Sequence, residues 1–175
     1  LHTSIAQTTE NLKRFFQEAD VCKRINSRFV VKVHDIRMVG RQPFITMEHV
    51  DGPTALERLF HLQAPLGFRE LVSIGMDVAE ALVATASAGV VHRDVKPSNI
   101  LLGPDCAKLS DFGIAKALDR PAITEIGIGL GTLAYCAPEQ ALSAMDVDPR
   151  ADIYGLGATL YHLVTGRPPY DTTRP

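Results

Sequence analysis

The sequence has 175 residues, of which 46% are hydrophobic and 22% are charged, and its formal net charge at pH 7 is −2. This length is typical of a single domain with its own core, and the composition excludes a disordered or fibrous polypeptide. The near-neutral charge argues against binding to nucleic acid or to an anionic membrane through bulk charge. The longest run without a charged residue, 153–166, is shorter than the ~20 apolar residues of a membrane-spanning helix.

The first fifty residues predict a helix followed by a β-hairpin. Apolar residues recur every three or four positions over residues 8–25, which is the period of an amphipathic helix. Residues 29–36 and 44–50 are rich in β-branched and aromatic side chains and are separated by a short polar stretch. This pattern favours two antiparallel strands joined by a turn.

The next part of the chain predicts two helices. Thr54 follows a turn sequence and is a suitable N-cap for a short helix that ends at Leu59. Residues 68–88 predict a long helix, with Gly89 just beyond its C-terminus. One apolar stripe runs along this helix, at Leu71, Ile74, Val78 and Leu82.

The remainder predicts short extended pieces, an irregular segment and a last helix. Residues 100–102 and 107–110 are extended in pattern, and residues 111–139 show no period. An irregular segment of this length inside a compact domain is typically functional. Residues 149–164 predict the last helix, whose apolar positions are Ile153, Leu156, Leu160 and Leu163.

Polar residues with catalytic chemistry lie in the loop after the long helix. Residues 92–99 read HRDVKPSN, residues 111–113 read DFG, and residues 137–139 read APE. On these motifs, in this order, the chain resembles the protein-kinase catalytic domain, and specifically the bacterial eukaryotic-like Ser/Thr protein kinases. The resemblance implies an α+β, bilobal fold, with a partial N-lobe at residues 1–50 and a partial C-lobe at residues 51–175.

The resemblance also implies a reaction and its catalytic residues. The reaction would be transfer of the γ-phosphoryl group of ATP to Ser or Thr hydroxyls of protein substrates in signal transduction. Asp94 would accept the proton of the substrate hydroxyl, and Lys96 would lie against the γ-phosphate. Asn99 and Asp111 would offer hard oxygen ligands to Mg²⁺, with Mn²⁺ as the alternative ion.

The resemblance implies further positions that would bind ATP. Met47 matches the residue that limits the depth of the adenine pocket, and the backbone groups of Glu48 and Val50 would bond adenine. Leu101 would form the floor beneath the base. Glu18 would pair with a strand lysine, although its alternative is an ordinary solvated helix glutamate.

Several residues would support the catalytic loop. His92 is expected to have a structural role, packing with Phe112 in an apolar column that also includes Cys22 and Val33. Asp152 would bind the loop backbone. The remaining supporting positions that the resemblance implies are Gly113, which permits a sharp turn, Thr132, which bonds Asp94 and Lys96, and Glu139, which pairs with an arginine.

A phosphorylation site is a further hypothesis. Thr124 is the only Ser, Thr or Tyr between Gly113 and Gly131. In the family, the arginine that matches Arg93 pairs with an activation-loop phosphate. Thr124 is therefore either a phosphorylation site or an ordinary loop residue.

No Gly-rich loop and no strand lysine precede the first helix, and the chain begins with Leu1. We therefore expect a fragment of a longer kinase domain, inactive or nearly so by itself, because preorganised phosphate contacts are missing. Three cysteines without metal-ligand spacing favour a reducing, cytoplasmic location. The parent protein could be membrane-anchored elsewhere.

Two other functions are compatible with these motifs. One is a pseudokinase that scaffolds protein partners without catalysis, and the other is a small-molecule phosphotransferase. The complete set of Asp94, Lys96, Asn99 and Asp111 argues against the first, and the APE segment argues against the second.

Overall fold

The computed structural model describes residues 16–17, 19–40, 42–112, 133–142 and 147–170. Residues 16–17 and 19–23 are helical. The longer elements are two antiparallel hairpins and four helices: β1 (Val33–Val39), β2 (Gln42–Met47), α2 (Ala55–Leu62), α3 (Phe68–Ser87), β3 (Ile100–Leu102), β4 (Ala107–Leu109), α5 (Pro138–Leu142) and α6 (Arg150–Thr165). A 3-10 turn, η1 (Pro97–Asn99), precedes β3. None of the described helices is both long and apolar enough to span a membrane.

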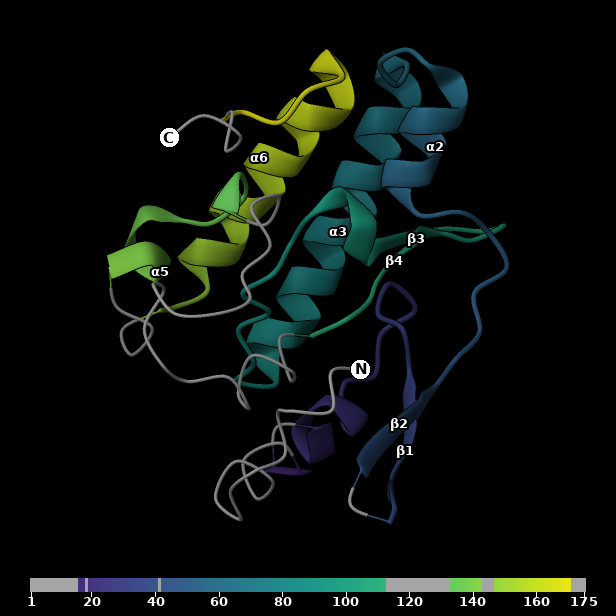
Figure 1. Cartoon of the computed structure of the whole chain (residues 1–175), viewed down its shortest axis with the longest axis vertical. Coiled ribbons are helices and arrows are strands. Elements are labelled where there is room, and N and C mark those ends of the chain that lie inside the picture. Colours follow the sequence, from purple (N-terminus) through teal and green to yellow (C-terminus); the bar gives the residue numbers. More distant parts are fainter. Residues whose placement is uncertain (1–15, 18, 41, 113–132, 143–146, 171–175) are drawn as a thin grey trace.

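The described elements lie toward two ends of the molecule (Figure 1). Helices α2, α3 and α6 lie together at one end of the molecule, and the β3–β4 hairpin packs against α3. The β1–β2 hairpin and the first helical residues lie at the other end. A mixed α and β architecture was expected, and this is the arrangement that the structure shows.

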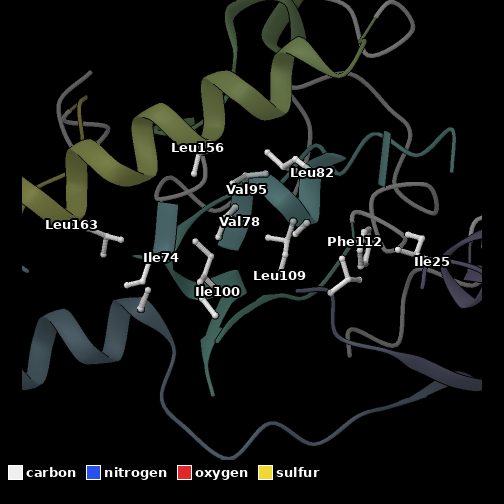
Figure 2. Close-up of a cluster of buried hydrophobic side chains, with 14 of the residues drawn as sticks. Ile25, Ile74, Val78, Leu82, Val95, Ile100, Leu109, Phe112, Leu156 and Leu163 are labelled. Atoms are coloured by element: carbon white, nitrogen blue, oxygen red, sulfur yellow. The ribbon is translucent and has the colours of Figure 1, made fainter. Parts of the chain in front are cut away.

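The main core lies between α3, α6 and the second hairpin (Figure 2). Apolar side chains of these elements pack together at its centre, namely Ile74, Val78, Leu82, Ile100, Leu109, Leu156 and Leu163. The predicted stripe on α3 is confirmed, because three of its members are buried and Leu71 is packed against the same cluster.

The prediction for α6 is wrong at one position. Ile153 is 60% exposed, whereas Leu156 and Leu163 are buried and Leu160 is partly buried. The buried face of α6 instead begins with Ala151 and Asp152. Apolar periodicity alone missed this face because small and polar residues occupy part of it.

The first hairpin is displaced from its predicted bounds. β1 begins later and ends later than residues 29–36, and β2 ends at Met47. Val30 leaves the hairpin because it forms a parallel bridge with Leu109. Gly40, at a φ of 61°, supplies the turn between the strands. Residues 48–50 therefore form a connection instead of the end of a strand.

The helix ends follow from their capping residues. The side chain of Thr54 accepts a hydrogen bond from the Glu57 amide, and the Glu57 carboxylate accepts one from the Thr54 amide, which confirms Thr54 as the N-cap. α2 continues to Leu62, one turn beyond the predicted end. Gly89, at a φ of 73°, follows α3 as predicted. α5 lies partly within the segment predicted to be irregular.

Candidate active site

His92 is fully buried at the start of the loop that follows α3. Its ring nitrogens have fixed roles, because Nδ1 accepts a hydrogen bond from the Asp94 amide at 3.2 Å and Nε2 donates one to the Ser110 carbonyl at 2.9 Å. These partners select the neutral ring, and burial lowers the pKa of His92 below its ordinary value. The His92 and Phe112 ring centroids are 4.9 Å apart. Cys22 and Val33 are buried in the same core as Phe112.

Asp152 of α6 binds the backbone of this loop. Its carboxylate oxygens accept hydrogen bonds from the amides of His92, at 2.8 Å, and Arg93, at 2.7 Å. Burial raises the pKa of the Asp152 carboxyl, although the two amide bonds act in the opposite direction. The buried carboxylate thereby connects α6 to the residue that precedes Asp94.

The Asp94 carboxylate is held by two neighbours in the same loop. Oδ2 of Asp94 lies 2.9 Å from Nζ of Lys96 and accepts a hydrogen bond from Nδ2 of Asn99 at 3.0 Å. Nδ2 of Asn99 also donates to the Asp94 carbonyl at 2.8 Å. Charge-assisted bonds of this kind fix the direction of the carboxylate.

The second hairpin brings Asn99 close to Asp111. β3 and β4 pair antiparallel, with Ile100 opposite Leu109, so the residues that flank the hairpin meet. Ser110 joins them, because its amide and its hydroxyl both donate to the Asn99 carbonyl, at 2.9 and 3.1 Å. The Ser110 hydroxyl also lies 3.4 Å from Oδ2 of Asp111.

The donor set at this position fits a hard divalent cation. Both protons of the Asn99 amide group point to Asp94, and Oδ1 of Asn99, which lies 3.4 Å from the Ser98 hydroxyl, keeps a second lone pair that can act as a ligand. The Asp111 carboxylate adds charged oxygens, and its residue has a left-handed φ of 55°. Carboxylate and amide oxygens are the ligands that Mg²⁺ prefers.

The predicted adenine-binding positions lie on the connection between β2 and α2 and on β3. Met47 ends β2 and is 42% exposed. The Glu48 carboxylate forms an ion pair with Lys108, which lowers the pKa of Glu48. Within the described part of the chain, no backbone hydrogen bond occupies the Glu48 carbonyl or the Val50 amide. Leu101 lies on β3.

The connection is fixed against β3 by close backbone contacts. The Leu102 amide donates to the Pro53 carbonyl at 2.8 Å, and Thr54 forms a bridge with Leu101. Gly52 approaches the Leu102 carbonyl so closely that a Cβ atom would overlap it. Leu101, the predicted floor of the adenine site, is therefore held in place relative to the connection after β2, whose backbone is predicted to bond adenine.

Some predicted site residues lie outside the described residues, namely Glu18, Gly113, Thr124 and Thr132. Glu139 lies in the first turn of α5 and is exposed. The roles of these five residues stay predictions.

Two polar residues near the loop were missed by sequence reasoning. Gln140 of α5 donates through Nε2 to the Arg93 carbonyl at 3.0 Å. Thr159 of α6, which is buried, lies with its hydroxyl 3.4 Å from the Val95 carbonyl. The position of Gln140 directly after the APE motif was a usable signal, whereas Thr159 has no pattern that marks it.

Known proteins are similar to this chain over nearly its whole length. The family model described as "Protein kinase domain" matches residues 2–175. The serine/threonine-protein kinase PknL of Mycobacterium tuberculosis is 42% identical over 160 residues, covering 91% of this chain and 40% of PknL. PknB of Mycobacterium leprae is 36% identical over 176 residues, covering 97% of this chain and 28% of PknB.

Solved structures give the same result. The crystal structure of the M. tuberculosis PknI kinase domain matches with a TM-score of 0.80 and 34% identity, covering 100% of this chain and 64% of that domain. The chain thus spans less than half the length of the curated relatives and about two-thirds of the solved kinase domain. The names of these relatives favour the kinase interpretation over the scaffold and the small-molecule phosphotransferase.

Proposed function

The chain belongs to the protein kinase domain family, and from this premise we propose that the whole protein transfers the γ-phosphoryl group of ATP to Ser or Thr hydroxyls of proteins. The observation that carries the proposal is the arrangement of Asp94. Its carboxylate is held by Lys96 and Asn99, and Asn99 is joined through Ser110 to Asp111. This is a carboxylate base next to a cation and to a pair of oxygen ligands.

The chemistry uses Asp94 as the acceptor of the hydroxyl proton. The substrate oxygen forms a bond to the γ-phosphorus while the bond from that phosphorus to the leaving ADP oxygen breaks. The hydroxyl proton passes to Asp94 as the new bond forms. Lys96, which lies 2.9 Å from Asp94, is close enough to offset the charge of the transferring group.

Asn99 and Asp111 would hold a divalent metal ion, for which we propose Mg²⁺, with Mn²⁺ as the alternative. When bound, such an ion offsets the negative charge of the phosphates. The role of the chain is to fix the ligands, and Ser110 does so by bonding Asn99 and lying next to Asp111.

We further propose that adenine binds along the connection after β2. The Glu48 carbonyl and the Val50 amide would bond the base, with Met47 at the back and Leu101 beneath. This assignment places the boundary between the lobes after residue 50, where the chain leaves the first hairpin for α2. A cytoplasmic location and the absence of nucleic-acid binding stay predictions.

The test is phosphotransfer by the full-length protein. The purified protein would be incubated with radiolabelled ATP, Mg²⁺ and a Ser/Thr-containing protein substrate, followed by phosphoamino-acid analysis. We expect phosphoserine or phosphothreonine, and at least a hundredfold loss of rate in Asp94→Asn, because the general base is removed.

A matched control is Asp105→Asn, since Asp105 is an exposed aspartate on the turn between β3 and β4. This variant should keep the wild-type rate. Undiminished phosphotransfer in Asp94→Asn would contradict the proposed function.

A further inference from the structure

Arg93, which precedes Asp94, has a left-handed backbone. Its φ is 64°, a conformation that costs free energy in a non-glycine residue. Such a conformation persists only where the surroundings hold it in place. The contacts of the Arg93 backbone are therefore informative about the position of Asp94.

Two side chains from different helices hold the Arg93 peptide groups. Asp152 of α6 accepts the hydrogen bond of the Arg93 amide at 2.7 Å. Gln140 of α5 donates to the Arg93 carbonyl at 3.0 Å. The Arg93 carbonyl belongs to the peptide group that leads directly into Asp94, so Gln140 acts on the orientation of that peptide group.

The same amide group of Gln140 has a second partner. Its Oε1 accepts a hydrogen bond from the Ala137 amide at 3.1 Å. One side chain thus joins the backbone before Asp94 to the segment that precedes α5. A cavity of only about 10 Å³, the space of a single water, lies between the two, and Asp94, Tyr135, Cys136 and Gln140 are among the residues that line it.

This arrangement has a consequence for the acceptor. Tyr135 and Cys136 line the same small cavity as Asp94, so residues 135–137 lie next to the peptide group that leads into the proposed acceptor of the hydroxyl proton. The orientation of this peptide group, which Gln140 fixes against residues 135–137, then decides how well Asp94 faces the hydroxyl. A misalignment of about 1 Å in such a position costs on the order of a hundredfold in rate.

We propose that Gln140 is a positioning residue that sets the distance and orientation between the Asp94 peptide and the segment before α5, and thereby aligns the acceptor hydroxyl. The inference rests on the proposed kinase function and adds a residue to it. It assigns to Gln140 no contact with ATP or with the phosphoryl group.

An amide is the side chain that this position requires. It donates to the Arg93 carbonyl and accepts from the Ala137 amide. A glutamate has nearly the same shape but, when ionised, it can only accept hydrogen bonds. It would therefore keep the bond from the Ala137 amide, lose the bond to the Arg93 carbonyl, and repel that carbonyl oxygen. A leucine makes neither bond.

The experiment compares Gln140→Glu and Gln140→Leu in the full-length protein. Steady-state rates would be measured with a Ser-containing peptide at varied peptide and varied ATP, together with the folded fraction of each variant by urea denaturation. We expect kcat/KM for the peptide to fall about tenfold in both variants. KM for ATP should stay within about twofold of wild type, because Gln140 has no proposed contact with ATP.

Gln42→Glu is the control, because Gln42 is exposed on β2, away from the catalytic loop. It should behave as wild type. A loss of rate that is matched by an equal loss of folded protein would overturn the inference, since it would show a structural role only. A wild-type rate in Gln140→Glu would also overturn it, because the Arg93 bond would then have no effect. Absence of phosphotransfer in the wild-type protein would instead refute the proposed function.

Discussion

The amide of Arg93 donates a 2.7 Å hydrogen bond to Oδ1 of Asp152, although 59 residues separate the two in sequence. The second oxygen of the same carboxylate accepts from the His92 amide. A carboxylate has only acceptors, so it satisfies two neighbouring amides at once. The geometry of the catalytic loop is thereby set by a residue of α6.

Asp152→Asn should destabilise the protein. An asparagine offers one acceptor, and its NH₂ group would face an amide that also donates. We expect a loss of about 1–3 kcal/mol in the free energy of unfolding, the cost of leaving a buried donor without a partner. Urea denaturation measures this loss. The control is Asp148→Asn, a partly exposed aspartate paired with Arg150, which should change the midpoint far less. Equal midpoints for the two variants would refute the assignment.

Stability should fall as the pH falls below about 6.5 because of His92. Burial lowers the pKa of His92 from its ordinary value of 6.5. Between the folded and the unfolded pKa, the unfolded chain binds the proton and the folded chain does not, so stability rises with pH in this window and is lost on acidification. One such group contributes a slope of at most about 1.4 kcal/mol per pH unit.

Urea denaturation of wild type and His92→Leu from pH 5 to 7.5 measures this slope. The raised pKa of Asp152 acts in the opposite direction, and the lowered pKa of His162 in the same direction, so only the difference between variants isolates His92. His61→Leu, at an exposed site on α2, is the control and should keep the wild-type slope. The same slope in His92→Leu and wild type would be evidence against a neutral buried His92.

The sequence predicted the long elements and the catalytic loop because both have local signals. The apolar stripe of α3 follows the helical period, and Thr54 has the chemistry of an N-cap. The hairpin bounds were less accurate because Val30 pairs with Leu109, a contact that depends on residues about eighty positions apart. Ile153 was misplaced because the buried face of α6 includes the polar Asp152, which faces the catalytic loop.

For the candidate site, motif spacing was enough to select Asp94, Lys96, Asn99 and Asp111, whose roles stay predictions, since they lie on one loop and one hairpin. It was not sufficient for Gln140, because its partners lie on separate parts of the chain. A residue that acts through a side-chain hydrogen bond to a distant part of the backbone is marked in the sequence by no periodic pattern and by no fixed spacing. Such residues become visible only when the fold is known.

Gly52→Ala should disturb the connection that we assign to adenine binding. A Cβ atom at this position would overlap the Leu102 carbonyl, so the connection and β3 would have to separate. We expect a loss of about 1–3 kcal/mol in stability, as for other overpacked sites, and a raised KM for ATP in the full-length protein. Gly67→Ala is the control, because nothing lies within 4 Å of a Cβ atom there. An unchanged melting temperature and an unchanged KM would show that the contact yields without cost.

Two glycines of α6 provide a matched test of how closely this helix supports the catalytic loop. A Cβ atom at Gly155 would lie 3.1 Å from both Cβ and the carbonyl oxygen of Val95, whereas one at Gly157 would meet nothing within 4 Å. Val95 directly follows Asp94, so any added volume at Gly155 presses on the catalytic loop.

We expect Gly155→Val to be about 1–3 kcal/mol less stable than Gly157→Val, because helix propensity is the same for both changes and only packing against Val95 differs. Urea denaturation gives the stability difference, and peptide phosphorylation by the full-length protein shows whether the loop has moved. Gly155→Val should also lose activity at a temperature where it remains folded, since a displaced Val95 displaces Asp94. If both variants had the same stability and the same activity, α6 would not be the rigid support that these contacts indicate.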